Sequence, residues 1–361
     1  MEMSFICGIV GLPGVGKTAI FNAITAAGAA GFGKDEANRA TVQVPDSRIE
    51  PLVKMYNAPK IVPAQMEVVD IPGLKAGSTA SGGRGSKLLA HVKDVDALIH
   101  VVRCFEDPDL AHEYDSINPA RDVETIDLEM VVADAQTVQN KIDRIAKKAK
   151  SGDADAKRDL AALETVKASL DSGVPARKMG LGERELAAVF DCNLVSLKPV
   201  MYVANLKTPS DAKNEHVAAL EKLASEEKAE TVIVCGRDEA DIAQLDPEDQ
   251  KVFLAELGLE ESSMERLIQA AYRTLGLVNF ITAGPKEVHI WTCEAGSKAP
   301  RAAGKIHSDM EQGFIRMEVM TFVDLMELGS EAAVTKAGKL RVEGKDYVVQ
   351  DGDIVVIRFN K

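Results

Sequence analysis

The stretch Gly11-Leu-Pro-Gly-Val-Gly-Lys17-Thr18 matches the phosphate-binding loop pattern GxxxxGK(S/T) at every fixed position. Residues 5–10 before it form an apolar run typical of a short buried strand, and residues 19–27 after it have a helical pattern. The pattern is informative only in this strand–loop–helix order. We therefore predict a loop that binds the phosphates of a nucleotide.

The residue types of the loop explain this chemistry. Glycines let the backbone turn and approach an anion closely, because no Cβ stands in the way. Backbone N–H groups of the loop and of the first helical turn then point at the phosphates, where the helix dipole also favours negative charge. Lys17 offers a cation to the β- and γ-phosphates, and Thr18 offers a hydroxyl to Mg²⁺. The predicted nucleotide-binding residues of the loop are Gly14, Val15, Gly16, Lys17, Thr18 and Ala19.

A second motif, Asp70-Ile-Pro-Gly73, ends the next apolar segment. In nucleotide switches an aspartate at this strand end reaches Mg²⁺, usually through water, and the glycine lets a backbone N–H approach the γ-phosphate. The same pattern also occurs in many ordinary turns, so it indicates a nucleotide switch only in combination with the phosphate loop. We predict Thr18 and Asp70 as metal-binding residues and Gly73 as a switch residue. The glycine- and serine-rich segment 77–85 is then either a nucleotide-sensing loop or an ordinary surface loop.

Composition narrows the class of protein. The five cysteines are scattered singly, which argues against a zinc site or a disulfide framework and favours a reducing cytosol. The N-terminal residues have no basic segment of a signal peptide, and no apolar stretch approaches the roughly 20 residues of a membrane span. We expect a cytoplasmic protein without a membrane partner. Because the net charge is −13, any contact with nucleic acid needs a local basic patch.

The order of predicted elements indicates the fold class. Five short apolar segments alternate with helical ones and are typical of buried strands: residues 5–10, 66–70, 97–105, 199–205 and 230–235. They predict a doubly wound parallel α/β sheet with its ligand loops at the carboxyl ends of the strands. From residue 278 onwards the pattern changes to glycine-separated strands, which predicts a small β-rich module.

An inserted arm is predicted over residues 122–172. Apolar residues there step by three and four along the first helix: Leu128, Val131, Ala135, Val138, Ile142, Ile145 and Ala149. A turn at residues 151–153 and a returning helix complete an antiparallel coiled coil. Basic residues outnumber acidic ones at its tip: Lys141, Arg144, Lys147, Lys148, Lys150, Lys157 and Arg158. This tip is either a contact for a polyanion such as rRNA or a solvated coiled-coil face.

These motifs resemble those of the YchF subfamily of Obg-like P-loop ATPases, within the translation-factor class of GTPases. GLPGVGKT at residues 11–18 is similar to the family's GLPNVGKS, and VPAQMEVVDIPGL at 62–74 to its VPAxxxxVDIAGL. HVVRCFED at 100–107 is identical, and residues 314–316, 329–333 and 344–353 also match. The resemblance implies ATP hydrolysis and association with the ribosome (50S or 70S) in translation or stress response.

The resemblance also implies a domain order. We expect a P-loop G domain over residues 1–121 and 197–277, interrupted by a helical coiled-coil insertion at 122–196. A C-terminal, β-grasp-like TGS domain should follow at 278–361. The fold expected is thus α/β with an inserted antiparallel coiled coil and a β-rich C-terminal domain.

The chain departs from the family's pattern at two points. Lys34 stands where the family has the threonine that completes the Mg²⁺ shell. GTPases select guanine with NKxD and the family has NxxE, whereas this chain has Asn205-Leu-Lys-Thr208 without an acid. A guanine site needs a carboxylate that accepts from the base. We therefore predict a preference for ATP, with Asn205 and the backbone of Leu206 reading the adenine edge.

His112 is the predicted catalytic residue. Ras-like GTPases orient the attacking water with a glutamine directly after DxxG, and this chain has Leu74 there. His112 follows the predicted strand 97–105 in an Asp- and Pro-rich loop and aligns with a family histidine proposed for this role. An imidazole can orient water or share a proton near neutral pH. The alternative is a surface histidine without a catalytic role.

The leading hypothesis is therefore a nucleotide switch that hydrolyses ATP with Mg²⁺ and acts with ribosomes. One alternative is a GTPase of the same architecture. Another is a nucleotide-gated ribosome- or RNA-binding protein with negligible hydrolysis. A metabolic P-loop kinase is disfavoured, because the sequence shows neither an acceptor site nor an arginine-rich lid.

Overall fold

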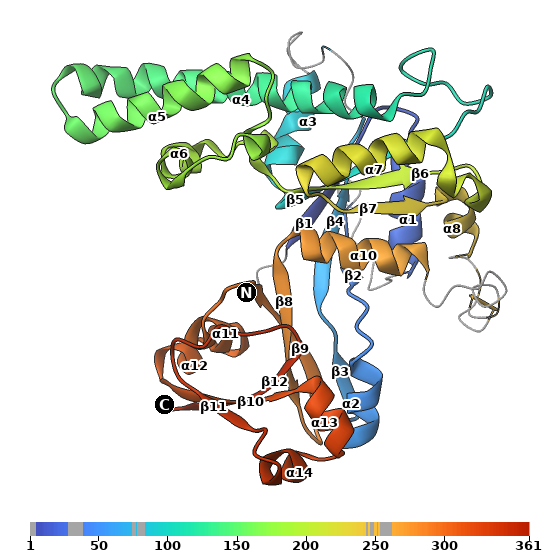
Figure 1. The fold of residues 1–361 in the computed structure, drawn as a ribbon, viewed down its shortest axis with the longest axis vertical. Helices are drawn as coiled ribbons and strands as arrows, with labels where there is room; N and C mark the ends of the chain where they lie inside the picture. The colour runs from blue at the N-terminus through green and yellow to red at the C-terminus, as the bar shows by residue number, and fades with distance from the viewer. Residues whose placement is uncertain are drawn as a thin grey trace. The chain divides into compact units, whose positions relative to one another are not determined.

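The computed structural model describes residues 5–27, 39–73, 77, 84–242, 245, 249, 250, 252 and 262–360. The chain forms two compact units. The phosphate-loop unit consists of Phe5–Thr41 and Glu67–Thr274, and the C-terminal unit contains Val42–Met66 and Leu275–Lys361. Figure 1 draws the elements of both units in the order of the chain.

A six-stranded sheet forms the centre of the phosphate-loop unit, in the order β2-β4-β1-β5-β6-β7. Its pairs β1–β4, β1–β5, β5–β6 and β6–β7 are parallel. The strands are β1 (Ile6–Val10), β2 (Arg39–Gln43), β4 (Gln65–Asp70), β5 (Ala97–Arg103), β6 (Val200–Asn205) and β7 (Thr231–Val234). The predicted doubly wound α/β fold is confirmed, with β2 as an additional edge strand.

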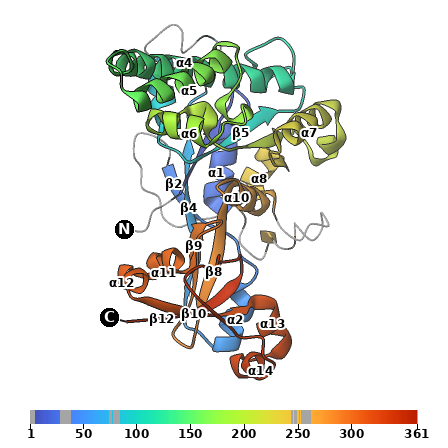
Figure 2. The same ribbon diagram turned by 60° about the vertical axis from the view of Figure 1, so that its left-hand side comes forward.

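Helices cover both faces of this sheet. Figures 1 and 2 show α1, α8 and α10 on one face and α4 and α7 on the other. Every residue of β5 and β6 is buried, as expected for strands between two helical layers. The helices of the unit, apart from the arm, are α1 (Lys17–Ala27), α3 (Arg84–Lys93), α7 (Glu215–Glu227), α8 (Gly236–Ile242) and α10 (Ser263–Thr274).

The predicted arm is an antiparallel helical hairpin of α4 (Pro119–Lys150) and α5 (Ala154–Asp171). Asn118 caps α4 by accepting from the N–H of Arg121 at 3.1 Å, and Asp153 caps α5 in the same way. Buried side chains from both helices meet along the seam, among them Val138 and Leu163. Leu128 is 42% exposed, so the apolar seam begins one turn later than predicted.

Three short helical turns and one helix follow the hairpin and pack against it. They are η1 (Ala176–Lys178), α6 (Glu183–Val189), η2 (Phe190–Cys192) and η3 (Val195–Leu197). The carboxylate of Asp134 on α4 holds η3 by accepting from the N–H groups of Val195 and Ser196 at 2.9 and 2.7 Å. These contacts join the hairpin to the strand β6 that comes next in the chain.

The C-terminal unit contains a second six-stranded sheet, in the order β11-β10-β12-β8-β9-β3. Its strands are β3 (Lys60–Val62), β8 (Leu277–Ala283), β9 (Glu287–Glu294), β10 (Phe314–Thr321), β11 (Arg341–Glu343) and β12 (Asp353–Phe359). Its helices are α2 (Ile49–Tyr56), α11 (Ala299–Ile306), α12 (Ser308–Gln312), α13 (Phe322–Leu328) and α14 (Glu331–Lys336). The predicted β-rich C-terminal module is confirmed.

One segment packs differently from the predicted division of the chain. Residues 42–66 lie within the predicted first G-domain segment, but they pack with the C-terminal residues. β3 pairs in parallel with β9, and Lys60 forms an ion pair of 2.7 Å with Glu287. The division at 121, 196 and 277 otherwise stays a prediction, with this segment as its exception.

Candidate functional site

The phosphate loop leaves the end of β1 and enters α1 through a backbone that requires glycine. Gly14 and Gly16 have φ values of 76° and 96°, which side chains rarely tolerate. A Cβ on Gly14 would stand 2.7 Å from the carbonyl oxygen of Ala111, and one on Gly16 would collide with Asn205. The first helical hydrogen bond runs from Ile20 N to Gly16 O at 3.1 Å. The preceding N–H groups of the turn are therefore available to an anion.

Lys17 lies inside the loop. Only 7% of the residue is exposed, and its Nζ donates to the carbonyl of Leu12 at 2.8 Å. Burial lowers the pKa of Lys17 to about 8, and the nearby charge of Asp70 partly opposes this shift. A Cβ added to Gly73 would stand 3.0 Å from this Nζ, so the predicted switch glycine lies beside the loop lysine.

Thr18 and Asp70 meet as the prediction requires. The hydroxyl of Thr18 donates to Oδ2 of Asp70 at 2.9 Å. The other oxygen, Oδ1, is buried and has no hydrogen-bond partner among the described residues. A buried carboxylate oxygen without a partner is costly, and a cation would satisfy it.

This pair fits Mg²⁺ by its chemistry. Hydroxyl and carboxylate oxygens are hard ligands, and Mg²⁺ usually takes only one or two protein carboxylates beside phosphate and water. Across the described part of the chain, no cluster of three or more His, Cys, Asp or Glu side chains could hold a metal alone. Phosphate oxygens of a bound nucleotide, together with water, would complete such a site beside Thr18 and Asp70.

Several predicted switch residues lie outside the described residues. These are Lys34, Leu74 and most of the segment 77–85. Gly77 is described, and its backbone N–H donates to Oε1 of Glu129 on α4 at 2.5 Å. This contact joins the chain beyond Gly73 to the base of the helical hairpin.

Asn205 supports the phosphate loop. Its Nδ2 donates to the carbonyl of Val15 at 2.8 Å, and its Oδ1 accepts from the N–H of Gly236 at 3.1 Å. The residue is 5% exposed. These two bonds use one of the two Nδ2 hydrogens, and the other could still donate to a base. That Asn205 reads the adenine edge stays a prediction.

Leu206 offers less to a base than predicted. Its N–H donates to the carbonyl of Val234 at 2.8 Å, as part of the sheet. Its carbonyl faces the thiol of Cys235, with the sulfur 3.6 Å away. Of its two backbone polar groups, only this carbonyl retains capacity for an adenine amino group.

The loop that carries His112 lies against the phosphate loop, since the carbonyl of Ala111 is the nearest neighbour of Gly14. The His112 side chain is 5% exposed, which does not fit the alternative of a surface histidine. Its Nδ1 accepts from the N–H of Tyr114 at 3.2 Å. Its Nε2 lies 3.1 Å from Oδ2 of Asp122, without the angles of a hydrogen bond. The catalytic role of His112 stays a prediction.

Arg103 is a positioning residue that the sequence analysis missed. It is 1% exposed, and its guanidinium donates to the carbonyls of Phe105, Asp107 and Leu110 at 3.0, 3.0 and 3.1 Å. These bonds fix the loop that brings Ala111 to Gly14. An arginine inside the apolar segment 97–105 was the signal that could have indicated it.

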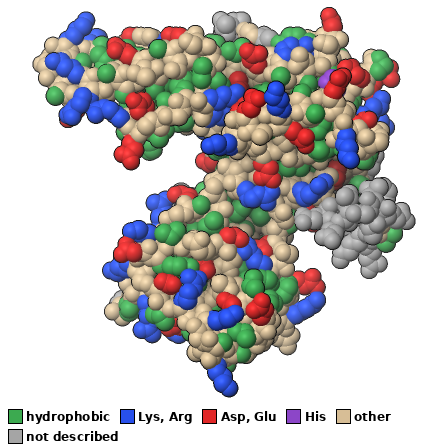
Figure 3. All heavy atoms as spheres, viewed as in Figure 1, with side chains coloured by type: hydrophobic (Ala, Val, Ile, Leu, Met, Phe, Trp, Pro, Cys, Tyr) green, Lys and Arg blue, Asp and Glu red, His purple; other side chains and the backbone are tan. Residues whose placement is uncertain are grey.

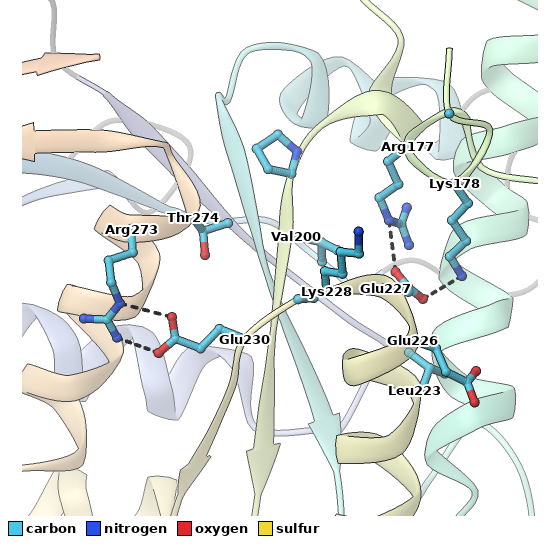
Figure 4. Close-up of a pocket in the computed structure, with 13 residues that line it drawn as sticks. Arg177, Lys178, Val200, Leu223, Glu226, Glu227, Lys228, Glu230, Arg273 and Thr274 are labelled. Atoms are coloured by element: carbon cyan, nitrogen blue, oxygen red, sulfur yellow. Dashed lines mark hydrogen bonds and ion pairs between the residues drawn. The ribbon is translucent and has the colours of Figure 1, made fainter. Parts of the chain in front are cut away.

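A cavity of about 870 Å³ lies elsewhere in this unit (Figure 4). It borders Val200, at the start of β6, whereas the phosphate loop contacts the other end of that strand at Asn205. Figure 4 shows Glu227 between Arg177 and Lys178, with ion pairs of 3.3 and 2.6 Å. These groups tie η1 to α7, and the cavity is separate from the nucleotide site.

Comparisons with known proteins agree with this geometry. Residues 6–149 match a family model described as "50S ribosome-binding GTPase", and residues 277–360 match the YchF-GTPase_C model, described as "Protein of unknown function (DUF933)". "Ribosome-binding ATPase YchF" of Haemophilus ducreyi is 44% identical, covering 99% of this chain and 100% of that protein. "Obg-like ATPase 1" of Oryza sativa subsp. japonica is 40% identical, covering 98% and 91%.

A solved structure is similar over its whole length. The Schizosaccharomyces pombe YchF GTPase has a TM-score of 0.84 and 31% identity to this chain, and the match covers 98% of each. In addition, none of the helices in the described ranges combines the length and apolar character needed to cross a membrane.

Proposed function

We propose that this chain, which belongs to the YchF family of Obg-like ATPases, is a P-loop switch that hydrolyses ATP to ADP and phosphate and acts with ribosomes. Relatives over 98–99% of this chain carry the name ribosome-binding ATPase. With a ribosomal partner, 50S or 70S, the location that we propose is the cytoplasm.

The observation that carries the proposal is the Thr18–Asp70 pair beside Lys17. A buried carboxylate oxygen without a protein partner, next to a hydroxyl and a buried ammonium, suits a metal–phosphate complex. Thr18 and Asp70 would hold Mg²⁺, which neutralises charge on the phosphates when bound. Lys17 would exchange its bond with the Leu12 carbonyl for a phosphate oxygen.

Backbone groups supply the remaining phosphate contacts. The N–H groups from Gly14 to Ala19, at the start of α1, would donate to the phosphates, and the N–H of Gly73 would meet the γ-phosphate. The His112 imidazole would orient the attacking water after rotating away from Asp122, whose Oδ2 lies 3.1 Å from its Nε2.

ATP is the proposed substrate rather than GTP. The stretch Asn205–Thr208 contains no acid to accept from guanine, and the Asn205 amide is engaged with the phosphate loop. The carbonyl of Leu206 would accept from the adenine amino group. A GTPase is the alternative, since the matching family model and the similar solved structure carry that name.

The hairpin tip is the proposed contact with rRNA. Figure 3 shows Lys and Arg side chains gathered at the free end of the hairpin. Phosphate contacts of this kind are strongly salt-dependent. Reversing Lys147, Lys148 and Lys150 to Glu should weaken co-sedimentation with ribosomes and flatten its salt dependence, without lowering basal ATPase activity.

Magnesium-dependent ATP hydrolysis tests the proposal directly. Phosphate release should require Mg²⁺ in the wild type and fall at least tenfold in Asp70→Asn at equal Mg²⁺. The exposed Asp94 is the matched control, because Asp94→Asn removes the same charge far from the loop. Equal activity of Asp70→Asn and wild type would refute the assignment.

A further inference from the structure

Phe190 is the one exposed aromatic side chain among the residues that the structure describes, and it is 86% exposed. It begins η2, directly after α6, on the side of the helical hairpin (Figure 1). Leu186, one helical turn earlier, is 42% exposed. The exposed ring offers its π-face to a binding partner.

The residues around Phe190 fix its backbone. Val189 before it is 1% exposed and Cys192 after it is 7% exposed, and both pack into the hairpin core. Lys141 on α4 donates from Nζ to the carbonyl of Ala188 at 2.7 Å and also pairs with Asp191. The backbone on both sides of Phe190 is thus held in place, so little backbone entropy is left to lose on binding.

Basic side chains on α4 contact Asp191, the residue that follows Phe190. Arg144 is 3.7 Å from Asp191, the neighbour of Phe190 in the chain. Lys141, Arg144 and Lys148 are spaced by three and four, so they form one row along α4 towards the basic tip. Asp191 neutralises part of the charge at the near end, whereas Arg144 and Lys148 are exposed. The row runs from Asp191 towards the end of α4 at Lys150, and Figure 3 shows Lys and Arg side chains at the free end of the hairpin.

We infer that Phe190 is a stacking platform for an unpaired base of RNA, whose backbone follows Arg144 and Lys148 on α4. An aromatic ring beside a positively charged track is the arrangement by which proteins bind single-stranded nucleic acid. The ring supplies sequence-tolerant stacking, and the cations supply phosphate contacts. The inference rests on the proposed ribosomal partner. It adds one specific contact, the stacking of an RNA base on Phe190.

The charges favour RNA over a protein as the occupant. A protein partner of the same surface would need an acidic face with an apolar pocket for Phe190, and it would also use the neighbouring Leu186. Stacking uses the π-face of Phe190 alone. The two occupants therefore predict different effects of aromatic and aliphatic substitutions at these two positions.

The test measures binding of the full-length protein to a fluorescently labelled, unstructured RNA oligonucleotide by anisotropy, and to ribosomes by co-sedimentation. Phe190→Ala and Phe190→Leu should both weaken RNA binding about five-fold or more, the lower end of the range for losing one stacked base. Phe190→Trp should retain wild-type affinity. Because the ring contacts no phosphate, the salt dependence of all three variants should equal that of the wild type.

Two controls separate the possible outcomes. Leu186→Ala should bind RNA like the wild type, and Lys148→Ala should reduce the salt dependence by about one phosphate contact. Wild-type affinity of Phe190→Leu, or an equal loss in Leu186→Ala, would overturn stacking in favour of an apolar protein contact. If the triple Glu variant of the tip weakens ribosome binding while Phe190→Ala binds RNA normally, the stacking inference is wrong but the proposed ribosome contact stands. If the triple variant has no effect, the proposed ribosome contact fails as well.

Discussion

The side chain of Asn205 at the end of β6 donates a hydrogen bond of 2.8 Å to the carbonyl of Val15 in the phosphate loop, 190 positions earlier in the chain. Its oxygen accepts from Gly236 at the start of α8. One buried amide thus joins the loop to two elements of the second half of the unit. The phosphate loop is held in shape by a residue that lies beyond the helical insertion.

Removing this amide should weaken the binding of all nucleotides alike. In Asn205→Ala the Val15 carbonyl and the Gly236 N–H lose buried partners, at a cost of about 1–3 kcal/mol for each group. We expect the affinities for ATP, ADP and GTP to fall by similar factors in a fluorescence titration. Thr208→Val, in the same stretch but exposed, is the control. A loss confined to adenine nucleotides would instead make Asn205 a base reader.

Lys17→Ala should weaken triphosphate binding by about tenfold or more, since a hydrogen bond to a charged group contributes roughly 1.5–3 kcal/mol. The thermal midpoint without nucleotide should not fall, because burial opposes the charge of Lys17, as its pKa of about 8 indicates. Calorimetric titration and thermal unfolding measure the two effects. The exposed Lys222→Ala is the control for charge. Unchanged affinity in Lys17→Ala would disprove the phosphate-loop assignment.

His112→Ala should leave ATP affinity nearly unchanged and reduce ribosome-stimulated turnover at least tenfold, since general acid–base groups contribute about 10²–10⁴-fold. Asp122→Asn should not reduce turnover, because the imidazole has to rotate away from Asp122, 3.1 Å from its Nε2, to orient the water. The double variant should be no slower than His112→Ala alone. If His112→Ala hydrolysed ATP at the wild-type rate in the presence of ribosomes, His112 would not be catalytic. Backbone and metal contacts alone would then account for catalysis.

His100 should make the fold sensitive to acid. It is 2% exposed in β5, and burial, aided by the charge of Arg177, lowers its pKa from 6.5 to about 3. Between those values the unfolded chain binds a proton that the folded chain does not, so stability falls as pH decreases below 6.5. From pH 6.5 to 5 the loss is about 2 kcal/mol.

Denaturant unfolding of wild type and His100→Phe at both pH values measures this loss. The variant keeps a ring against Tyr202, whose centroid lies 5.6 Å from that of His100, but it cannot titrate. Between pH 6.5 and pH 5, the free energy of unfolding of His100→Phe should fall by about 2 kcal/mol less than that of the wild type. Parallel pH profiles for the two proteins would show that His100 is not the acid-sensitive group.

Local features of the chain were predictable from sequence. The glycine pattern fixes the phosphate loop, and the step of three and four along α4 fixes the hairpin, because both signals lie in adjacent residues. The meeting of Thr18 with Asp70 was also predictable, since parallel strands end at one edge of the sheet. β4 and β1 are neighbours there.

Features that depend on contacts across the fold were not predictable. The orientation of the Asn205 amide depends on Val15 and Gly236, and the sequence contains no sign of either contact. β3 is only Lys60–Val62, and its place in the second sheet depends on its pairing with β9. Likewise, the burial of His112 depends on where α4 places Asp122.

The central claim is that this chain is an ATPase that acts with ribosomes, and side-by-side turnover tests it most directly. Phosphate release from ATP and GTP is measured at equal Mg²⁺, with and without ribosomes, for the wild type and Lys17→Ala. The account predicts faster turnover of ATP than GTP, stimulation by ribosomes, and no activity above background in Lys17→Ala. Faster turnover of GTP, or turnover that ribosomes and Lys17→Ala leave unchanged, would contradict it.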